Sequence, residues 1–170
     1  MKKRVAVFLV FGVLICCGYA QAGWYKLTWG MTIDQIRAAL TEEVVLIPKE
    51  KNQPADYYGI RNFAIGECPF DVGFFFDQKE KLNKVVLSRK GKDSYRCFLK
   101  LEDELTKKYG TPTLIKDDED RRFHSAMHKR EWMTEDTRIE LNHVLMIIQG
   151  SAFDSLHLMY NSRLATEEKL

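Results

Sequence analysis

The chain has 170 residues, with 26 Lys plus Arg against 24 Asp plus Glu and a formal net charge of +2. This length suits one domain and excludes a large multidomain enzyme. Hydrophobic residues make up 45% and aromatic residues 12%, with ten Gly and four Pro, which excludes a disordered or collagen-like chain. The near balance of charge argues against a nucleic-acid binder, which would concentrate Lys and Arg.

The N-terminus has the pattern of a secretory signal peptide. Basic residues at positions 2–4 precede an uncharged stretch over residues 5–17, and Ala20 and Ala22 form the small-residue cleavage pattern. The uncharged stretch has 13 residues, fewer than the roughly 17 that a membrane span needs. We therefore expect cleavage after Ala22 and a periplasmic or secreted protein.

Lipidation at Cys16 or Cys17 is the alternative processing route. A lipoprotein signal normally has a small residue directly before its cysteine, whereas Ile15 precedes Cys16 and a cysteine precedes Cys17. Cleavage after residue 22 fits better and leaves one domain over residues 23–170. Without positions 2–4 that domain has 23 basic and 24 acidic residues, a charge of −1. No later segment reaches spanning length, so we expect no stable membrane span after cleavage.

Cleavage would leave two cysteines, Cys68 and Cys97. An even pair in an exported chain predicts a disulfide. The bridge would enclose 28 residues and tie the start of a strand to the first turn of a helix. Neither cysteine belongs to a CxxC motif. The alternative is a free reactive thiol that works with a distant histidine.

The first element is a short amphipathic helix over residues 32 to about 41. Thr32 and Gln35 form a capping box, in which each side chain bonds to the other residue's backbone N–H. Apolar residues recur at helical spacing, at Ile33, Ile36 and Leu40.

Three runs typical of strands follow a polar loop over residues 48–54. They cover residues 57–65, 70–76 and 82–89, and residues 77–81 form the turn between the last two. In the second run, apolar side chains alternate with Asp71 and Gly73, as expected for a strand with one buried face.

The second helix has the clearest periodicity in the chain. Its apolar stripe consists of Phe98, Leu101, Leu105 and Tyr109. Asp93 or Ser94 can cap its start, and Gly110 with Pro112 ends it. A charge run over residues 116–122 is interpreted as a solvated loop. Strand character then resumes over residues 127–133, 137–148 and 155–161, with Gly150, Ser151 and Asp154 marking the last turn.

The element order is helix-βββ-helix-βββ. Consecutive strands without intervening helices pair antiparallel, which predicts an α+β fold in two layers. We expect one antiparallel sheet with both helices on one face.

Short motifs along residues 24–164 resemble those of small, uncharacterised exported bacterial domains. They include the helix start Trp29-Gly30-Met31-Thr32, the segment Lys108-Tyr109-Gly110-Thr111-Pro112, and Leu158-Met159-Tyr160. The order of elements is similar, more distantly, to the β-lactamase-inhibitor-protein-like fold shared with the small outer-membrane assembly lipoprotein SmpA/OmlA. The resemblance implies a module that binds through its surface and has no catalytic residues to carry over.

The sequence gives only a weak signal for catalysis or metal binding. His124 and His128 are four residues apart and could join Asp118 or Glu119 around a metal, but no HExxH motif fixes a third ligand. Gly150-Ser151 lacks the second glycine of a nucleophile elbow. We therefore expect no enzyme activity, no cofactor and no metal.

Aromatic residues are the best candidates for an interaction surface. On a strand, Phe75 points to the face opposite its two phenylalanine neighbours, together with Gly73. Phe75 and Trp132 are the predicted contact residues, because aromatic side chains are enriched at interfaces.

The sequence thus predicts a secreted or periplasmic, non-catalytic module of the bacterial envelope that binds a protein or peptide. The alternative is a small exported enzyme or metal-binding protein that uses His124, His128 or a free cysteine. The sequence does not specify the partner or the oligomeric state.

Overall fold

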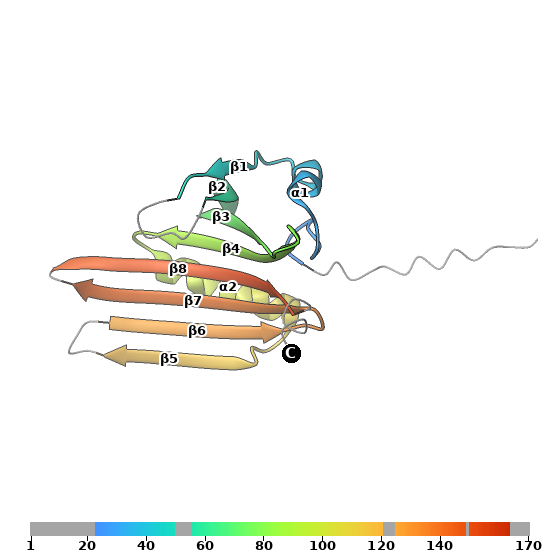
Figure 1. Ribbon diagram of the computed structural model, residues 1–170. Coiled ribbons are helices and arrows are strands. Elements are labelled where there is room, and N and C mark those ends of the chain that lie inside the picture. Colours follow the sequence, from blue (N-terminus) through green and yellow to red (C-terminus); the bar gives the residue numbers. More distant parts are fainter. Residues whose placement is uncertain (1–22, 50–55, 121–124, 149, 164–170) are drawn as a thin grey trace, which may run out of the picture.

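The computed structural model describes residues 23–49, 56–120, 125–148 and 150–163. The predicted signal peptide lies outside the described residues. The chain forms two helices and one eight-stranded antiparallel sheet (Figure 1). The elements are α1 Ile33–Ala39, β1 Val45–Ile47, β2 Tyr57–Ile65, β3 Cys68–Phe76, β4 Leu82–Lys90, α2 Ser94–Tyr109, β5 Leu114–Asp120, β6 Ser125–Met133, β7 Thr137–Ile148 and β8 Ser151–Ser162.

Each helix is followed by four strands rather than three, so the predicted helix-βββ-helix-βββ order is wrong. The strand order is β1-β2-β3-β4-β8-β7-β6-β5, and β4 pairs with β8 where the two halves meet. The additional strands β1 and β5 are the two edges of the sheet. Edge strands are short or charged in many proteins, so they lack the alternation that identifies a half-buried strand.

Strand β5 contains most of the charge run that was expected to be a loop. Its residues pair with β6 from Leu114 opposite Glu131 to Asp120 opposite Ser125. All of its side chains except Asp120 are exposed. The backbone therefore has a strand's hydrogen bonds, while the side chains have the composition of a solvated loop. Strand β8 also begins earlier than expected, at Ser151, and includes Asp154.

A local capping box marks the start of α1, whereas α2 begins without a cap from its own N-cap residue. The Thr32 hydroxyl accepts from the Gln35 backbone N–H, and the Gln35 side chain accepts from the Thr32 N–H, which confirms the capping box. Asp93 occupies the N-cap position of α2, but its side chain makes no capping bond. Asp154 of β8 accepts from the Ser94 N–H at 3.4 Å instead.

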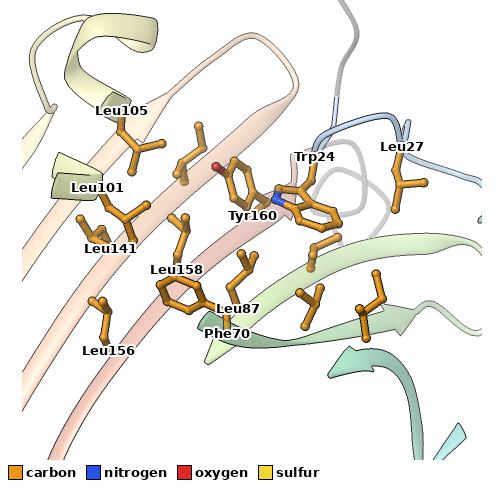
Figure 2. Close-up of a cluster of buried hydrophobic side chains, with 14 of the residues drawn as sticks. Trp24, Leu27, Phe70, Leu87, Leu101, Leu105, Leu141, Leu156, Leu158 and Tyr160 are labelled. Carbon is orange, nitrogen blue, oxygen red and sulfur yellow. The ribbon is translucent and has the colours of Figure 1, made fainter. Parts of the chain in front are cut away.

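The apolar core lies between the helices and one face of the sheet, which we call the helix face. Helix α2 packs against β6, β7 and β8 on this face, and the guanidinium of Arg37 in α1 lies over the ring of Tyr58 in β2. The core joins both halves of the chain (Figure 2) and includes Trp24, Leu27, Phe70, Leu87, Leu101, Leu141 and Leu158. The opposite side of the sheet is the open face, toward the viewer in Figure 1, where α2 runs behind the strands.

A disulfide joins Cys68, the first residue of β3, to Cys97 in the first turn of α2. The Cα atoms are 6.0 Å apart, and each cysteine is at most 2% exposed. The predicted bridge is confirmed, and neither residue is a free thiol. Within the described residues, no helix combines the length and the apolar character that crossing a membrane requires.

Candidate binding site on the open sheet face

The open face is divided into a charged half and an aromatic half. On β6 and β7, Arg138 pairs with Glu131 at 2.9 Å and with Glu140 at 3.5 Å. Lys129 pairs with Glu140 at 3.0 Å. The Glu131 carboxylate raises the pKa of Arg138, so the guanidinium stays charged. The charges on this half are thus paired with one another, which leaves the aromatic half as the better candidate for a binding surface.

The aromatic half contains a hollow of about 460 Å³ over β2, β3 and β4. Tyr57 and Phe75 lie on its wall with their rings stacked, the centroids 5.7 Å apart and the planes at 13°. Gly73 lies beneath the two rings, because a Cβ atom there would be 3.0 Å from a Phe75 ring carbon and 3.1 Å from a Tyr57 ring carbon. The absence of a side chain at Gly73 therefore leaves room for this ring pair.

Polar groups surround the hollow. Asp56, Asp71 and Ser88 are among its lining residues. The Ser88 hydroxyl is 3.1 Å from Nδ1 of His157 on the next strand, and Lys84 Nζ lies 6.0 Å from the centre of the Phe75 ring. The arrangement suits an apolar group of a ligand together with hydrogen-bonding groups at its edge, as in many binding sites.

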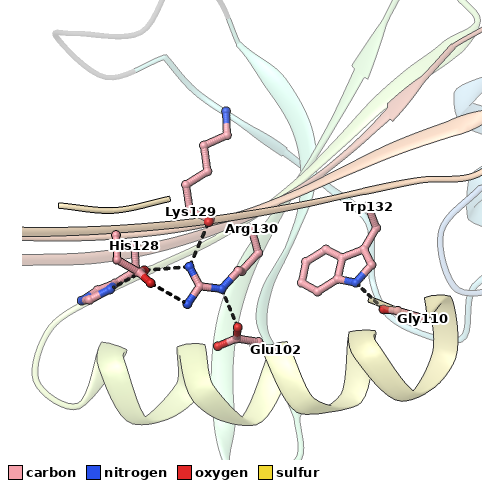
Figure 3. Close-up of polar contacts among 7 residues, drawn as sticks. Glu102, Gly110, His128, Lys129, Arg130 and Trp132 are labelled. Carbon is pink, nitrogen blue, oxygen red and sulfur yellow. Dashed lines mark hydrogen bonds and ion pairs between the residues drawn. The ribbon is translucent and has the colours of Figure 1, made fainter. Parts of the chain in front are cut away.

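The two predicted contact residues lie on opposite faces. Phe75 is on the open face and is 37% exposed. Trp132 is on the helix face, is 1% exposed, and donates its indole N–H to the Gly110 carbonyl at 2.9 Å (Figure 3). The prediction for Trp132 as a contact residue is wrong for this conformation, because the α2 end covers the ring.

Two histidines form a buried stack between α2 and the sheet. The rings of His128 and His143 are 5.6 Å apart, and Tyr95 of α2 lies within 5.3 Å of both. His128 is 7% exposed and bonds to Asp117 at 2.9 Å, while His143 is 2% exposed and bonds to Asp154 at 3.0 Å. Each histidine ring is thus hydrogen-bonded to a carboxylate of its own, which favours a role in stabilising the fold over a shared ligand site.

Nothing in the described part of the chain groups three or more His, Cys, Asp or Glu side chains in a way that could hold a metal ion. His124, the other histidine of the alternative metal-site hypothesis, lies outside the described residues. Asp118 is exposed on β5. The residues that were considered as ligands are therefore not brought together where the structure describes them.

Arg130 connects α2 to the edge of the sheet (Figure 3). It donates to Glu102 of α2 and, through both terminal nitrogens, to Asp117 of β5 at 2.7 and 3.2 Å. Burial opposes its charge, but the Asp117 and Glu102 carboxylates raise the pKa of Arg130. The Arg130 hydrogen bond in turn lowers the pKa of Asp117. This network fixes the position of α2 and has no contact with the hollow.

The sequence does not by itself identify the partnership of Tyr57 with Phe75. Alternation places each residue on a face, but the register that sets Tyr58 opposite Phe74, and thus Tyr57 beside Phe75, depends on the pairing of β2 with β3. The buried His128–His143 stack also requires register, since these residues are directly opposed on β6 and β7. The proximity of His143 to His128 could not be read from their spacing.

Comparison with known proteins gives no family for this chain. No family model matches it, and no curated protein matches it. A solved structure, that of LpqN, which is involved in cell envelope biogenesis of Mycobacterium tuberculosis, is similar with 12% sequence identity. The match covers 76% of this chain and 72% of LpqN, with a TM-score of 0.21. With a TM-score this low, the similarity supports no conclusion about the fold or the function of this chain. Conclusions about both are therefore drawn from the chain's own geometry.

Proposed function

We propose that this chain is an extracytoplasmic, non-catalytic module that binds an envelope protein or peptide at the hollow of the open face. The observation that carries the proposal is the stacked Tyr57–Phe75 pair over Gly73, which forms a partly exposed aromatic wall of the hollow. Aromatic side chains that are partly exposed around a concavity are typical contact residues.

The ligand group that fits is one apolar side chain of a polypeptide. The hollow has aromatic and aliphatic walls, from Phe75 and Val86 among others, and its carboxylates and hydroxyl can bond to the amides that flank such a side chain. The charged half of the open face, on β6 and β7, presents ion pairs between neighbouring side chains instead.

The extracytoplasmic location is supported by the Cys68–Cys97 disulfide together with the N-terminal export pattern. Disulfides persist in the periplasm and outside cells, and the cytoplasm keeps thiols reduced.

Site-specific photocrosslinking in living cells tests the proposal. A photoreactive phenylalanine at position 75 is expected to give a discrete crosslinked partner, and the same group at Leu99 is expected to give none. Leu99 is the matched control, because it is 47% exposed on α2, away from the hollow. Tyr57→Ala should weaken the crosslink at position 75 by about tenfold or more, since it removes half of the ring pair. Equal crosslinking from both positions, or no effect of Tyr57→Ala, would exclude the hollow as the binding site.

A further inference from the structure

The β7–β8 hairpin extends beyond β4 and β6, the described strands on either side of it (Figure 1). The last pair of β6 with β7 is Ala126 with Leu145, and the last pair of β4 with β8 is Lys90 with Ser155. Past these positions, residues 146–148 pair with residues 151–153 and with no other described strand. Three residue pairs at a strand rise of about 3.4 Å make a ribbon that extends about 10 Å past the described ends of β6 and β4.

This projecting ribbon, which we call the hairpin tip, is apolar on both of its faces. Ile147 and Ile148 point to opposite faces, as successive strand residues do, and they are 45% and 57% exposed. Phe153 is paired with Met146, so it shares a face with Ile148, and it is 44% exposed. A flat docking partner would cover only one of these faces.

Charged residues are absent from the hairpin tip and begin again at its base. No Asp, Glu, Lys or Arg occurs between Glu140 and Asp154. Asp154 bonds to buried His143, and its carbonyl accepts from the Gly91 N–H at 3.0 Å, which holds the β4–α2 loop against the base. Lys92 of that loop is exposed. The change from apolar to charged surface therefore occurs over one or two residues.

We propose that the hairpin tip inserts into the interfacial layer of a lipid bilayer and holds the protein at a membrane surface. A lipid layer surrounds an inserted ribbon on both faces, which matches the two-sided apolar surface. Amphipathic elements that lie in this layer reach about 5–10 Å into it, which is comparable to the length of the tip. The unpaired backbone groups at the edges of a two-stranded ribbon need water, so the tip stops at the boundary between headgroups and acyl chains.

The inserted surface is separate from the hollow and does not depend on the proposed binding there. The hollow lies over β2–β4 and Gly73, whereas the tip belongs to the end of β7 and the start of β8. A protein with both would present its open face to a partner while the tip contacts the membrane.

A tryptophan reporter tests insertion directly. Ile148→Trp is expected to lose fluorescence when the purified protein is mixed with phosphatidylcholine vesicles that carry brominated acyl chains. Leu114→Trp is the matched control, because Leu114 is likewise an exposed apolar residue on a strand, 41% exposed, but lies outside the hairpin. The three native tryptophans are common to both variants, so the difference in quenching reports the new ring. Equal quenching, or none, would overturn the proposal.

Vesicle sedimentation supplies the second measurement. Ile147→Ser/Ile148→Ser should bind phosphatidylcholine vesicles at least about tenfold more weakly than the wild type, because two aliphatic contacts with the lipid are lost. Leu114→Ser/Ile115→Ser should bind like the wild type. Circular dichroism checks that both variants fold. If the tip instead contacts a second copy of this chain, the protein will form oligomers without lipid, and Ile147→Ser/Ile148→Ser will dissociate them without changing vesicle binding. That result would also overturn the proposal.

Discussion

Nε2 of His143 lies 3.0 Å from a carboxylate oxygen of Asp154, while Nδ1 of the same ring is buried without a hydrogen-bond partner among the described residues. The geometry fits a neutral imidazole that donates from Nε2 and leaves Nδ1 unprotonated. Protonation would create a buried donor with no acceptor. Burial accordingly lowers the pKa of His143 from its ordinary 6.5, although the Asp154 carboxylate opposes this shift.

Acid is therefore expected to destabilise the fold through His143. The folded state binds this proton less readily than the unfolded state does, so stability is full above pH 6.5 and falls as the pH drops toward the lowered pKa. His128 and Tyr95 face the same ring, and neither supplies an acceptor for Nδ1. Urea unfolding at about pH 7.5 and about pH 5.5 should show a lower free energy of unfolding at the lower pH.

The variant His143→Gln separates this effect from other titrations. Glutamine can still donate to Asp154 but has no titrating group. It should cost about 1–2 kcal/mol at about pH 7.5, because the ring contacts with Tyr95 and Phe98 are lost. Its stability should then change less between the two pH values than that of the wild type. A pH dependence equal to the wild type's would place the responsible group elsewhere.

Arg130 and Arg138 provide a matched pair of substitutions on the two faces of the sheet. Arg130→Met should destabilise the protein by about 2 kcal/mol, because it leaves the carboxylates of Glu102 and Asp117 without their shared partner. The Arg130 side chain is 10% exposed, whereas that of Arg138 is 42% exposed. Arg138→Met leaves the carboxylate of Glu131, whose side chain is 11% exposed, without its partner, while Lys129 still pairs with Glu140, so it should cost about 1 kcal/mol. Chemical denaturation measures both, and equal costs would contradict the assignment of Arg130 as the anchor of α2.

The sequence predicts the interior elements of this fold well and its edges poorly. Residues 57–65 are strand as expected, and the helical stripe of Phe98, Leu101 and Leu105 is buried. These segments have a periodic pattern because one of their faces is in the core. In β5 nearly every side chain is exposed, and the strand exists only because its backbone pairs with β6. The pattern of side chains along the sequence therefore does not predict that pairing.

For the candidate site too, the sequence predicts the position of some residues and not of others. Alternation is enough to place Phe75 on the open face with Gly73. It cannot decide the face for Trp132, because an aromatic residue near the end of a strand fits either a core or a surface. The structure resolves this through the hydrogen bond from Trp132 to Gly110, a contact between the end of α2 and β6 that no local pattern specifies.

The disulfide should contribute a large part of the stability. Cys68→Ser/Cys97→Ser is expected to lower the free energy of unfolding by about 3–4 kcal/mol, since the bridge removes loop-closure entropy from the unfolded chain. The bridge also ties β3 to the start of α2. Alkylation followed by mass spectrometry should label neither cysteine in unreduced native protein. Labelling of both in that state would show that the bridge does not form.

Substitutions at Trp132 and Phe75 should separate folding from binding. Trp132→Phe keeps most of a ring that is 1% exposed but removes the donor to the Gly110 carbonyl, so it should cost about 1–2 kcal/mol. Phe75→Ala removes a ring that is 37% exposed and should cost less than about 1 kcal/mol. Chemical denaturation measures both costs. Binding of the crosslinked partner should be retained in Trp132→Phe and lost in Phe75→Ala, since only Phe75 borders the hollow. Loss of binding in Trp132→Phe with its stability intact would mean that the helix face, and α2 with it, opens when the partner binds.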